Sequence, residues 1–139
     1  MPLHPLVVHG AVVLGPLAAL LALAYVVPRA RQWARWPMVV TGVVAAGFVL
    51  AAYLSGGDLL DANPSLRQPP AIATHEDRAV YALTATLVLA VLAVLAGLLH
   101  RRPGAVPVVV RVLLALTAVA TLVAVIATGD AGSRAVWGA

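Results

Sequence analysis

The residues able to do chemistry gather near the ends of the apolar segments of this 139-residue chain. His4, His9 and His75 stand at or just before the start of an apolar run, and Asp58 and Asp130 each follow a glycine at the end of one. Imidazole and carboxylate groups ligate divalent ions, and two imidazoles can also hold haem iron from both sides. The pattern therefore predicts a histidine site for a metal ion or a b-type haem.

The composition predicts that these residues belong to an integral membrane protein. Hydrophobic residues make up 63% of the chain and charged residues only 10%, whereas about 25% of a soluble domain is charged. This disfavours a soluble enzyme and excludes a disordered chain. Because a helix needs roughly 20 apolar residues to cross a bilayer, we expect an all-α, up-down-up-down four-helix bundle. It would be one domain over 1–139, with helices at about 6–27, 36–55, 78–99 and 105–128 and an outer loop at 56–77.

The placement of charge predicts the orientation in the membrane. The first-to-second and third-to-fourth helix connections, with the adjoining turns, carry six arginines and no acid. The opposite end carries all five acids and three arginines, so the net charges are +6 and −2. By the positive-inside rule, both hairpin loops should be cytoplasmic and both termini should lie outside a bacterial plasma membrane. The basic composition is thus a topology signal, and nucleic-acid binding has no support.

The two halves of the chain resemble each other. Each half reads as a histidine, a helix, a basic loop, a helix, and then a small residue, glycine and aspartate, with His9 and Asp58 in the first half and His75 and Asp130 in the second. Both halves have the same orientation, which predicts a parallel repeat about an axis along the membrane normal. The repeat would set His9 opposite His75 on diagonal helices. The alternative is a chance likeness between Ala-, Val- and Leu-rich helices.

Two sets of ligands follow from this arrangement. In the first, His9 and His75 are the axial ligands of a haem b that passes electrons. Arg78 and Arg134 would then face the haem propionates. The nearby carboxylates would tune the site: Asp58, Asp61 and Asp130. In the second, a divalent ion is bound by side chains from both halves: His4, His9, His75, Asp58 and Asp130. A histidine at a helix end can also simply contact interfacial water, and an aspartate after glycine is common in turns.

Other functions are disfavoured or left open by the same sequence. No ionisable residue lies in the middle of an apolar run, which disfavours a proton pump or ion transporter. The chain has no hydrolase, kinase or metalloprotease motif, so an enzyme acting on its own is not favoured. The remaining interpretations are an accessory subunit of a larger respiratory or redox complex, a homo-oligomer in the lipid bilayer, and a small-molecule, lipid or quinone binder.

Several short motifs resemble one bacterial family of predicted membrane proteins, domain of unknown function 2231. Segment 4–9, His-Pro-Leu-Val-Val-His, is similar to the family's opening, in which His-Pro and two or three apolar residues precede His-Phe-Pro. Segment 55–62, Ser-Gly-Gly-Asp-Leu-Leu-Asp-Ala, resembles its Gly-x-x-Asp segment. His75 stands where the family has a histidine before the third helix, and segment 127–136 resembles the closing Thr-Gly-His-x-Gly-Gly.

The chain departs from the family pattern at two places. Gly10-Ala11 stands where the family has Phe-Pro, and Asp130 replaces the closing histidine. If that histidine is a ligand in the family, the resemblance implies an altered site in this chain. Some members of the family are joined to cytochrome c or rubredoxin-like domains, which implies redox neighbours. The resemblance implies no established activity.

The predicted orientation can be tested by labelling. Ala30→Cys and Ala62→Cys place single thiols in the first hairpin loop and the outer loop of a chain that has no cysteine. A membrane-impermeant thiol reagent added to intact cells should label the Ala62→Cys protein alone, since the arginine-rich loop should be cytoplasmic. Lysed cells provide the control, because both variants should then react. Labelling of Ala30→Cys in intact cells would contradict the orientation.

Overall fold

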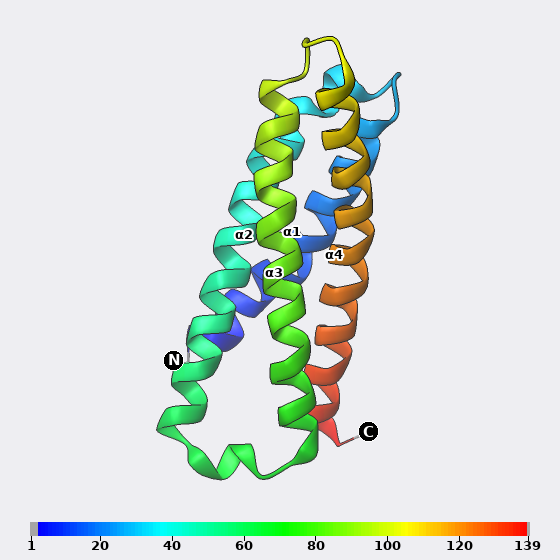
Figure 1. Cartoon of the computed structure of the whole chain (residues 1–139). Coiled ribbons are helices and arrows are strands. Elements are labelled where there is room, and N and C mark those ends of the chain that lie inside the picture. Colours follow the sequence, from blue (N-terminus) through cyan, green and yellow to red (C-terminus); the bar gives the residue numbers. More distant parts are fainter. Residues whose placement is uncertain (1–2, 139) are drawn as a thin grey trace.

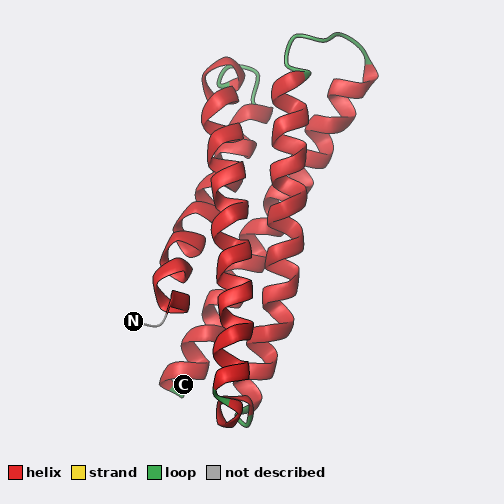
Figure 2. Ribbon diagram, turned by 90° about the vertical axis from the view of Figure 1, so that its left-hand side faces the viewer, coloured by secondary structure: helices red, strands yellow, loops and turns green. Residues whose placement is uncertain are grey.

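Four long helices run alternately up and down through the molecule (Figure 1). The computed structural model describes residues 3–138, so Met1, Pro2 and Ala139 of the predicted domain lie outside the described residues. The elements are α1 (Leu3–Val26), α2 (Arg31–Ala62), the short 3-10 helix η1 (Pro64–Arg67), α3 (Pro70–Leu98) and α4 (Ala105–Trp137). The predicted all-α four-helix architecture is confirmed, and the described residues contain helices, turns and loops only (Figure 2).

All four helices are longer than the apolar runs predict, α1 by only two residues and the other three by more. α2 continues through Gly56 and Gly57 to Ala62, and the following Asn63-Pro64 ends it because proline cannot continue a helix. α3 begins at Pro70, since proline is tolerated in a first helical turn. α4 likewise continues past Gly129 to Trp137. The predicted outer loop at 56–77 is therefore only the short connection from 63 to 69.

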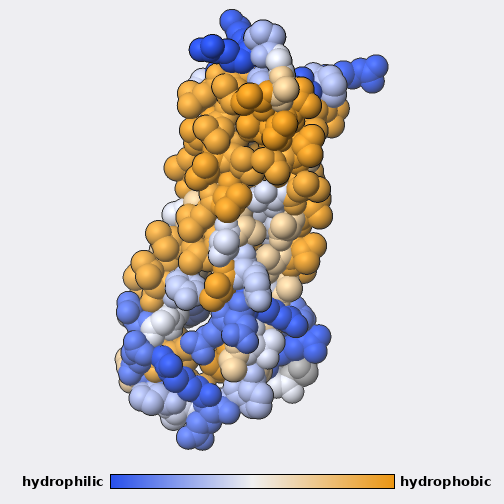
Figure 3. Space-filling model, viewed as in Figure 1, coloured by the Kyte–Doolittle hydropathy of each residue, from blue (hydrophilic) through white to orange (hydrophobic). Residues whose placement is uncertain are grey.

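All four helices are long and apolar enough to cross a membrane. The 32 residues of α2 extend about 48 Å at 1.5 Å per residue, well beyond a hydrocarbon core of about 30 Å. Figure 3 shows a broad apolar belt with polar residues at both ends, and the deeper polar zone lies at the end with the α2–α3 connection. We call this the terminal end, because both described chain ends lie toward it (Figure 2), and we call the opposite one the hairpin end.

The helices pack around a core of small side chains. α1 contacts α2 and α4, α3 contacts the same two helices, and α1 and α3 are the diagonal pair expected from the sequence. The fully or almost fully buried residues include Ala19, Ala22, Ala45 and Ala118, whose methyl groups let helix backbones approach closely. Larger core side chains, such as Tyr25, Met38, Leu89 and Leu114, fill the space towards the hairpin end.

Buried positions repeat between the two hairpins. Each buried residue of α1 has a buried counterpart 71 residues later in α3; the pairs include Ala11 with Ala82, Gly15 with Thr86, and Ala22 with Ala93. Between α2 and α4 the shift is 76 residues, as in Met38 with Leu114, Val49 with Val125, and Ser55 with Ala131. The shift grows by five because the matched buried positions that flank the connection are nine residues apart in the first hairpin (Tyr25 and Ala34) and fourteen apart in the second (Ala96 and Val110). The matching burial supports the repeat of two hairpins.

Side chains also join the hairpins at the hairpin end. The buried Tyr25 hydroxyl donates to the carbonyl of Ala96 at 2.8 Å and lies 3.1 Å from Nδ1 of His100. Nε2 of His100 is 2.8 Å from Oε1 of Gln32. Burial, and then the guanidinium groups around it, beginning with Arg35, lower the pKa of His100. His100 therefore links α1 and α2 to the end of α3 and has no part in the histidine pair described below.

Close packing at Gly97 generates a stability prediction. A Cβ at this position would lie 2.7 Å from Cγ2 of Val39 on α2, whereas a Cβ at Gly47 meets none of the described residues within 4 Å. Gly97→Ala should therefore destabilise the bundle by about 1–3 kcal/mol, the usual cost of overpacking. Gly47→Ala, the matched control, should leave the melting temperature in detergent unchanged or raise it, because alanine favours helix. Equal melting temperatures for the two variants would contradict the packing described here.

Candidate functional site

A pocket lies between the four helices near the terminal end, with a volume of about 80 Å³. Its wall follows the repeat. From α1 and α3 it takes the counterparts His4 and His75, Val8 and Ala79, and Ala11 and Ala82. From α2 and α4 it takes Val49 and Val125, Ala52 and Thr128, and Tyr53 and Gly129. The pocket therefore lies on the pseudo-twofold axis of the bundle, and its polar groups include one imidazole from each hairpin.

His4 is held by the neighbouring helix of its own hairpin. Its Nδ1 lies 2.9 Å from the carbonyl oxygen of Ala52 on α2 and 3.2 Å from Oγ of Ser55. The Ser55 hydroxyl itself donates to the Ala52 carbonyl. The imidazole packs on Gly56, where a Cβ would lie 3.0 Å from Cε1 of the ring. A glycine at this position thus lets the ring lie flat enough against α2 to reach the carbonyl.

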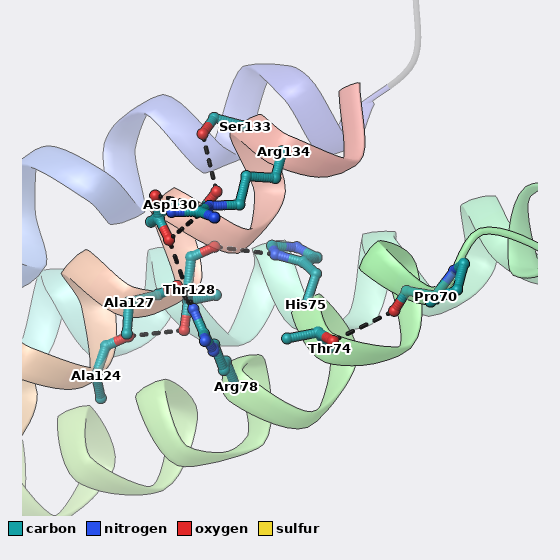
Figure 4. A network of polar contacts seen from close by, with 10 residues as sticks. All are labelled: Pro70, Thr74, His75, Arg78, Ala124, Ala127, Thr128, Asp130, Ser133 and Arg134. Atoms are coloured by element: carbon teal, nitrogen blue, oxygen red, sulfur yellow. Dashed lines mark hydrogen bonds and ion pairs between the residues drawn. The ribbon is translucent and has the colours of Figure 1, made fainter. Parts of the chain in front are cut away.

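His75 repeats this arrangement in the second hairpin. Its Nδ1 lies 3.0 Å from the carbonyl oxygen of Thr128 on α4, as Figure 4 shows. Its ring packs on Gly132, where a Cβ would lie 3.1 Å from Cε1. Thr128 and Gly132 are the counterparts of Ala52 and Gly56 under the same 76-residue shift. The two histidines therefore occupy equivalent positions of the repeat. Each bonds to an equivalent backbone carbonyl, and each packs on an equivalent glycine.

These contacts determine the chemistry left to each ring. A carbonyl oxygen can only accept a hydrogen bond, so Nδ1 of each ring is the donor, and in a neutral imidazole Nε2 then carries the lone pair. Within residues 3–138, the structure records no hydrogen bond to Nε2 of His4 or His75. Metal-bound histidines almost always donate their other N–H in this way, which fixes the tautomer and the ring. Each Nε2 is thus free to coordinate a metal or accept a hydrogen bond.

Charged residues predicted for the site come together beside His75. A carboxylate oxygen of Asp130 lies 3.1 Å from Nε of Arg134 and 3.7 Å from Nη1 of Arg78 (Figure 4). Arg78 also donates to the carbonyl of Ala127 at 3.0 Å, which ties α3 to α4. All three side chains are partly exposed, so each pair adds little stability. They are not part of the pocket wall, and only the contacts of Arg78 join α3 to α4 next to the histidine.

Other predicted site residues lie away from the pocket. His9 is exposed, and its Nδ1 is 2.6 Å from the carbonyl of Pro5 in its own helix. Asp58 is exposed, and Asp61 pairs with Arg67 at the surface. Among residues 3–138, no three His, Asp or Glu side chains lie close enough together to hold a metal ion. The predicted five-residue metal set is therefore not assembled, and the structure does not bring His9 to face His75.

The reason is the register of the repeat. His4 and His9 are five positions apart, about 140° around a helix, so only one of them can face the bundle interior. The buried positions pair His75 with His4, and Asp130 with Leu54 instead of Asp58. One sequence feature does indicate this register. Gly56 and Gly132 are 76 residues apart, the same shift that relates the buried positions of α2 and α4. Tyr53, whose apolar context gave no such signal, was not anticipated as a wall residue.

Comparison with known proteins agrees with the fold and with the opening and closing motifs. No curated protein and no solved structure matches the chain. A family model described as predicted membrane protein (DUF2231) matches residues 1–139, the full length of the sequence. This confirms the resemblance drawn from the motifs, and it agrees with four helices that can each cross a membrane. The chain belongs to the DUF2231 family of predicted membrane proteins.

Proposed function

We propose that this membrane protein binds a metal centre between its two hairpins, with Nε2 of His4 and Nε2 of His75 as ligands. One observation carries the proposal: two equivalent imidazoles line one pocket, and each has its Nδ1 bonded to a backbone carbonyl. This leaves two Lewis-basic nitrogens on residues that line a mostly apolar pocket. A ligand that only accepts hydrogen bonds, such as an oxidised quinone, would find no free donor there, because each Nδ1–H is already bonded to a backbone carbonyl.

A transition-metal ion fits the pocket better than a larger ligand. Imidazole suits zinc, copper, iron and nickel, and the volume of about 80 Å³ accommodates an ion with a few waters. Pockets for drug-sized molecules measure about 300–1,000 Å³. Since only two protein ligands are present, the remaining coordination positions would be taken by water or by a small exchangeable molecule. The function would be metal binding or handling in the membrane.

A haem b that passes electrons is the second candidate. Two anchored imidazoles on the diagonal helices α1 and α3 support it, because axial ligation of haem iron needs imidazoles on opposite sides. Arg78 and Arg134 lie near His75, where propionates could reach them. A macrocycle would require the two hairpins to move apart, since the pocket is small. We therefore rank the ion first.

We infer that the site faces the outside of the cell. Six arginines at the hairpin end, without an acid, support a cytoplasmic position for that end. The terminal end, with the pocket and all five acids, would then be extracytoplasmic. An ion could reach the histidines there without crossing the membrane.

The ligand assignment predicts which histidines matter. Purified protein titrated with Zn²⁺ or Cu²⁺ in calorimetry should bind one ion. His4→Ala and His75→Ala should each weaken binding by at least about 100-fold, since losing even an outer-shell partner costs 10- to 100-fold. His9→Ala is the matched control, because it removes an exposed imidazole of the same helix and should leave the affinity unchanged.

Haem is tested in parallel by titrating the same proteins with hemin and recording the Soret band. Haem would be the ligand instead of the ion if the wild-type protein binds no ion but shifts the Soret band, and if this shift is lost in His4→Ala and His75→Ala. Absence of both ion and haem binding, or an equal effect of His9→Ala, would overturn the proposed function.

The glycines beneath the rings provide a second prediction. Gly56→Ala and Gly132→Ala each place a Cβ 3.0–3.1 Å from an imidazole carbon, so the ring must shift and its bond to the carbonyl weakens. We expect about 10- to 100-fold weaker ion binding in calorimetry, the range for disturbing an outer-shell partner. Gly57→Ala is the control, because its Cβ meets no described residue within 4 Å. If Gly56→Ala and Gly132→Ala both bind the ion with wild-type affinity, the hydrogen bonds to the carbonyls do not position the imidazole ligands.

A further inference from the structure

The two sides of the pocket are not alike, and we infer that its ligand passes through one opening, between α1 and α4 beside Gly129. Tyr53 covers the equivalent place between α2 and α3. This inference rests on the proposed function for the identity of the ligand. The opening itself follows from the geometry of the repeat.

The first side is formed by α1 and α4. A Cβ at Gly15 of α1 would lie 3.1 Å from Cγ2 of Val125 on α4, so these two positions face each other. Val12 lies one turn before Gly15, and Gly129 lies one turn after Val125, so they share those faces. Both are wall residues of the pocket. Val12 is nevertheless 46% exposed, so the wall reaches the surface here.

The second side is formed by α2 and α3. A Cβ at Gly42 of α2 would lie 3.5 Å from Cβ of Ala93 on α3, so this face of α2 is turned towards α3. Tyr53 follows Gly42 by eleven residues, three helical turns, and shares that face. Tyr53 is the counterpart of Gly129; it is a wall residue of the pocket and is 41% exposed. A large ring thus stands where the other side has no side chain.

The remaining asymmetry agrees with this difference. Twelve of the thirteen wall residues form six counterpart pairs, and the one without a partner in the wall is Val12. Its counterpart Leu83, on the side of Tyr53, is not a wall residue. The pocket therefore extends further towards the surface on the α1–α4 side. A Cβ at Gly129 would meet none of the described residues within 4 Å, which leaves this side open.

The opening suits a small ligand and not a bulky one. It is bordered by valine and by the backbone of a glycine, and the carbonyl of the neighbouring Thr128 is already taken by His75. Within residues 3–138, no Asp, Glu or Arg side chain is part of the pocket wall. A hydrated ion that enters would find its first strong ligands at the two Nε2 atoms. The glycine then sets the rate of binding, and the histidines set its strength.

Thiol labelling tests the opening without any metal. Ala82 is a wall residue that is only 5% exposed, so a reagent reaches it through the pocket. In detergent-purified Ala82→Cys protein, a small cationic methanethiosulfonate reagent should modify the introduced thiol. Adding Gly129→Tyr should slow the reaction about tenfold or more, as a barrier raised by at least 1.4 kcal/mol would. Gly57→Tyr is the control and should not slow the reaction. A Cβ at Gly57, as at Gly129, meets no described residue within 4 Å, but Gly57 is not a wall residue of the pocket.

Stopped-flow metal binding tests the same opening with the proposed ligand. Gly129→Tyr should slow both association and dissociation of Zn²⁺ while the affinity changes little, since the barrier and not the ligands is altered. Tyr53→Ala should speed both by opening the second side. Slow labelling in Gly129→Tyr with no Zn²⁺ binding in any variant would support the opening but overturn the metal as ligand. Unchanged labelling and unchanged Zn²⁺ rates in Gly129→Tyr would overturn the opening.

Discussion

The carbonyl oxygens of Ala52 and Thr128 determine much of what the terminal end can do. Each belongs to a helical turn near the edge of the apolar belt, and each accepts a hydrogen bond from a histidine of the adjacent helix. An imidazole that is partly buried, as these are, would cost free energy in an apolar setting without such a partner. Because the bond uses Nδ1, it also fixes the ring and leaves Nε2 available. One contact thus joins the helix pair and orients the ring whose Nε2 is the ligand in the proposed function.

The same contact depends on the small residues of the bundle. Gly56 and Gly132 lie directly under the imidazole rings, and a side chain there would push the rings away from the carbonyls. Towards the middle of the bundle, Ala19 and Ala22 are fully buried, and their small side chains let the helices pack closely beyond the pocket. Small residues therefore serve two purposes here: Gly56 and Gly132 make room for the imidazole rings, and the buried alanines allow close helix packing.

Much of the fold could be predicted from the sequence, because length and hydropathy alone indicate four helices that can each cross a membrane. The helix ends at the terminal end could not, since polar helical turns such as those after Gly57 look like loops in an apolar-run analysis. Both histidines of the pocket wall are candidates from the sequence, but His4 enters only the wider metal set and the haem pair is His9 with His75. His75 was identified, but His9 was preferred to His4 because it is followed by apolar sequence. Only the burial register, which depends on how helices pack, separates the two.

The core towards the hairpin end argues for a binding site and against a path through the membrane. Beyond the pocket, the axis of the bundle is filled by Met38, Leu89 and Leu114, each at most 1% exposed, and at its far end by Tyr25. Among the described residues, the buried polar atom without a hydrogen bond is Oγ1 of Thr121, and a single hydroxyl cannot carry an ion across about 30 Å of hydrocarbon. A ligand held by the histidines would therefore leave by the side from which it came, and the difference between Gly129 and Tyr53 would govern how fast.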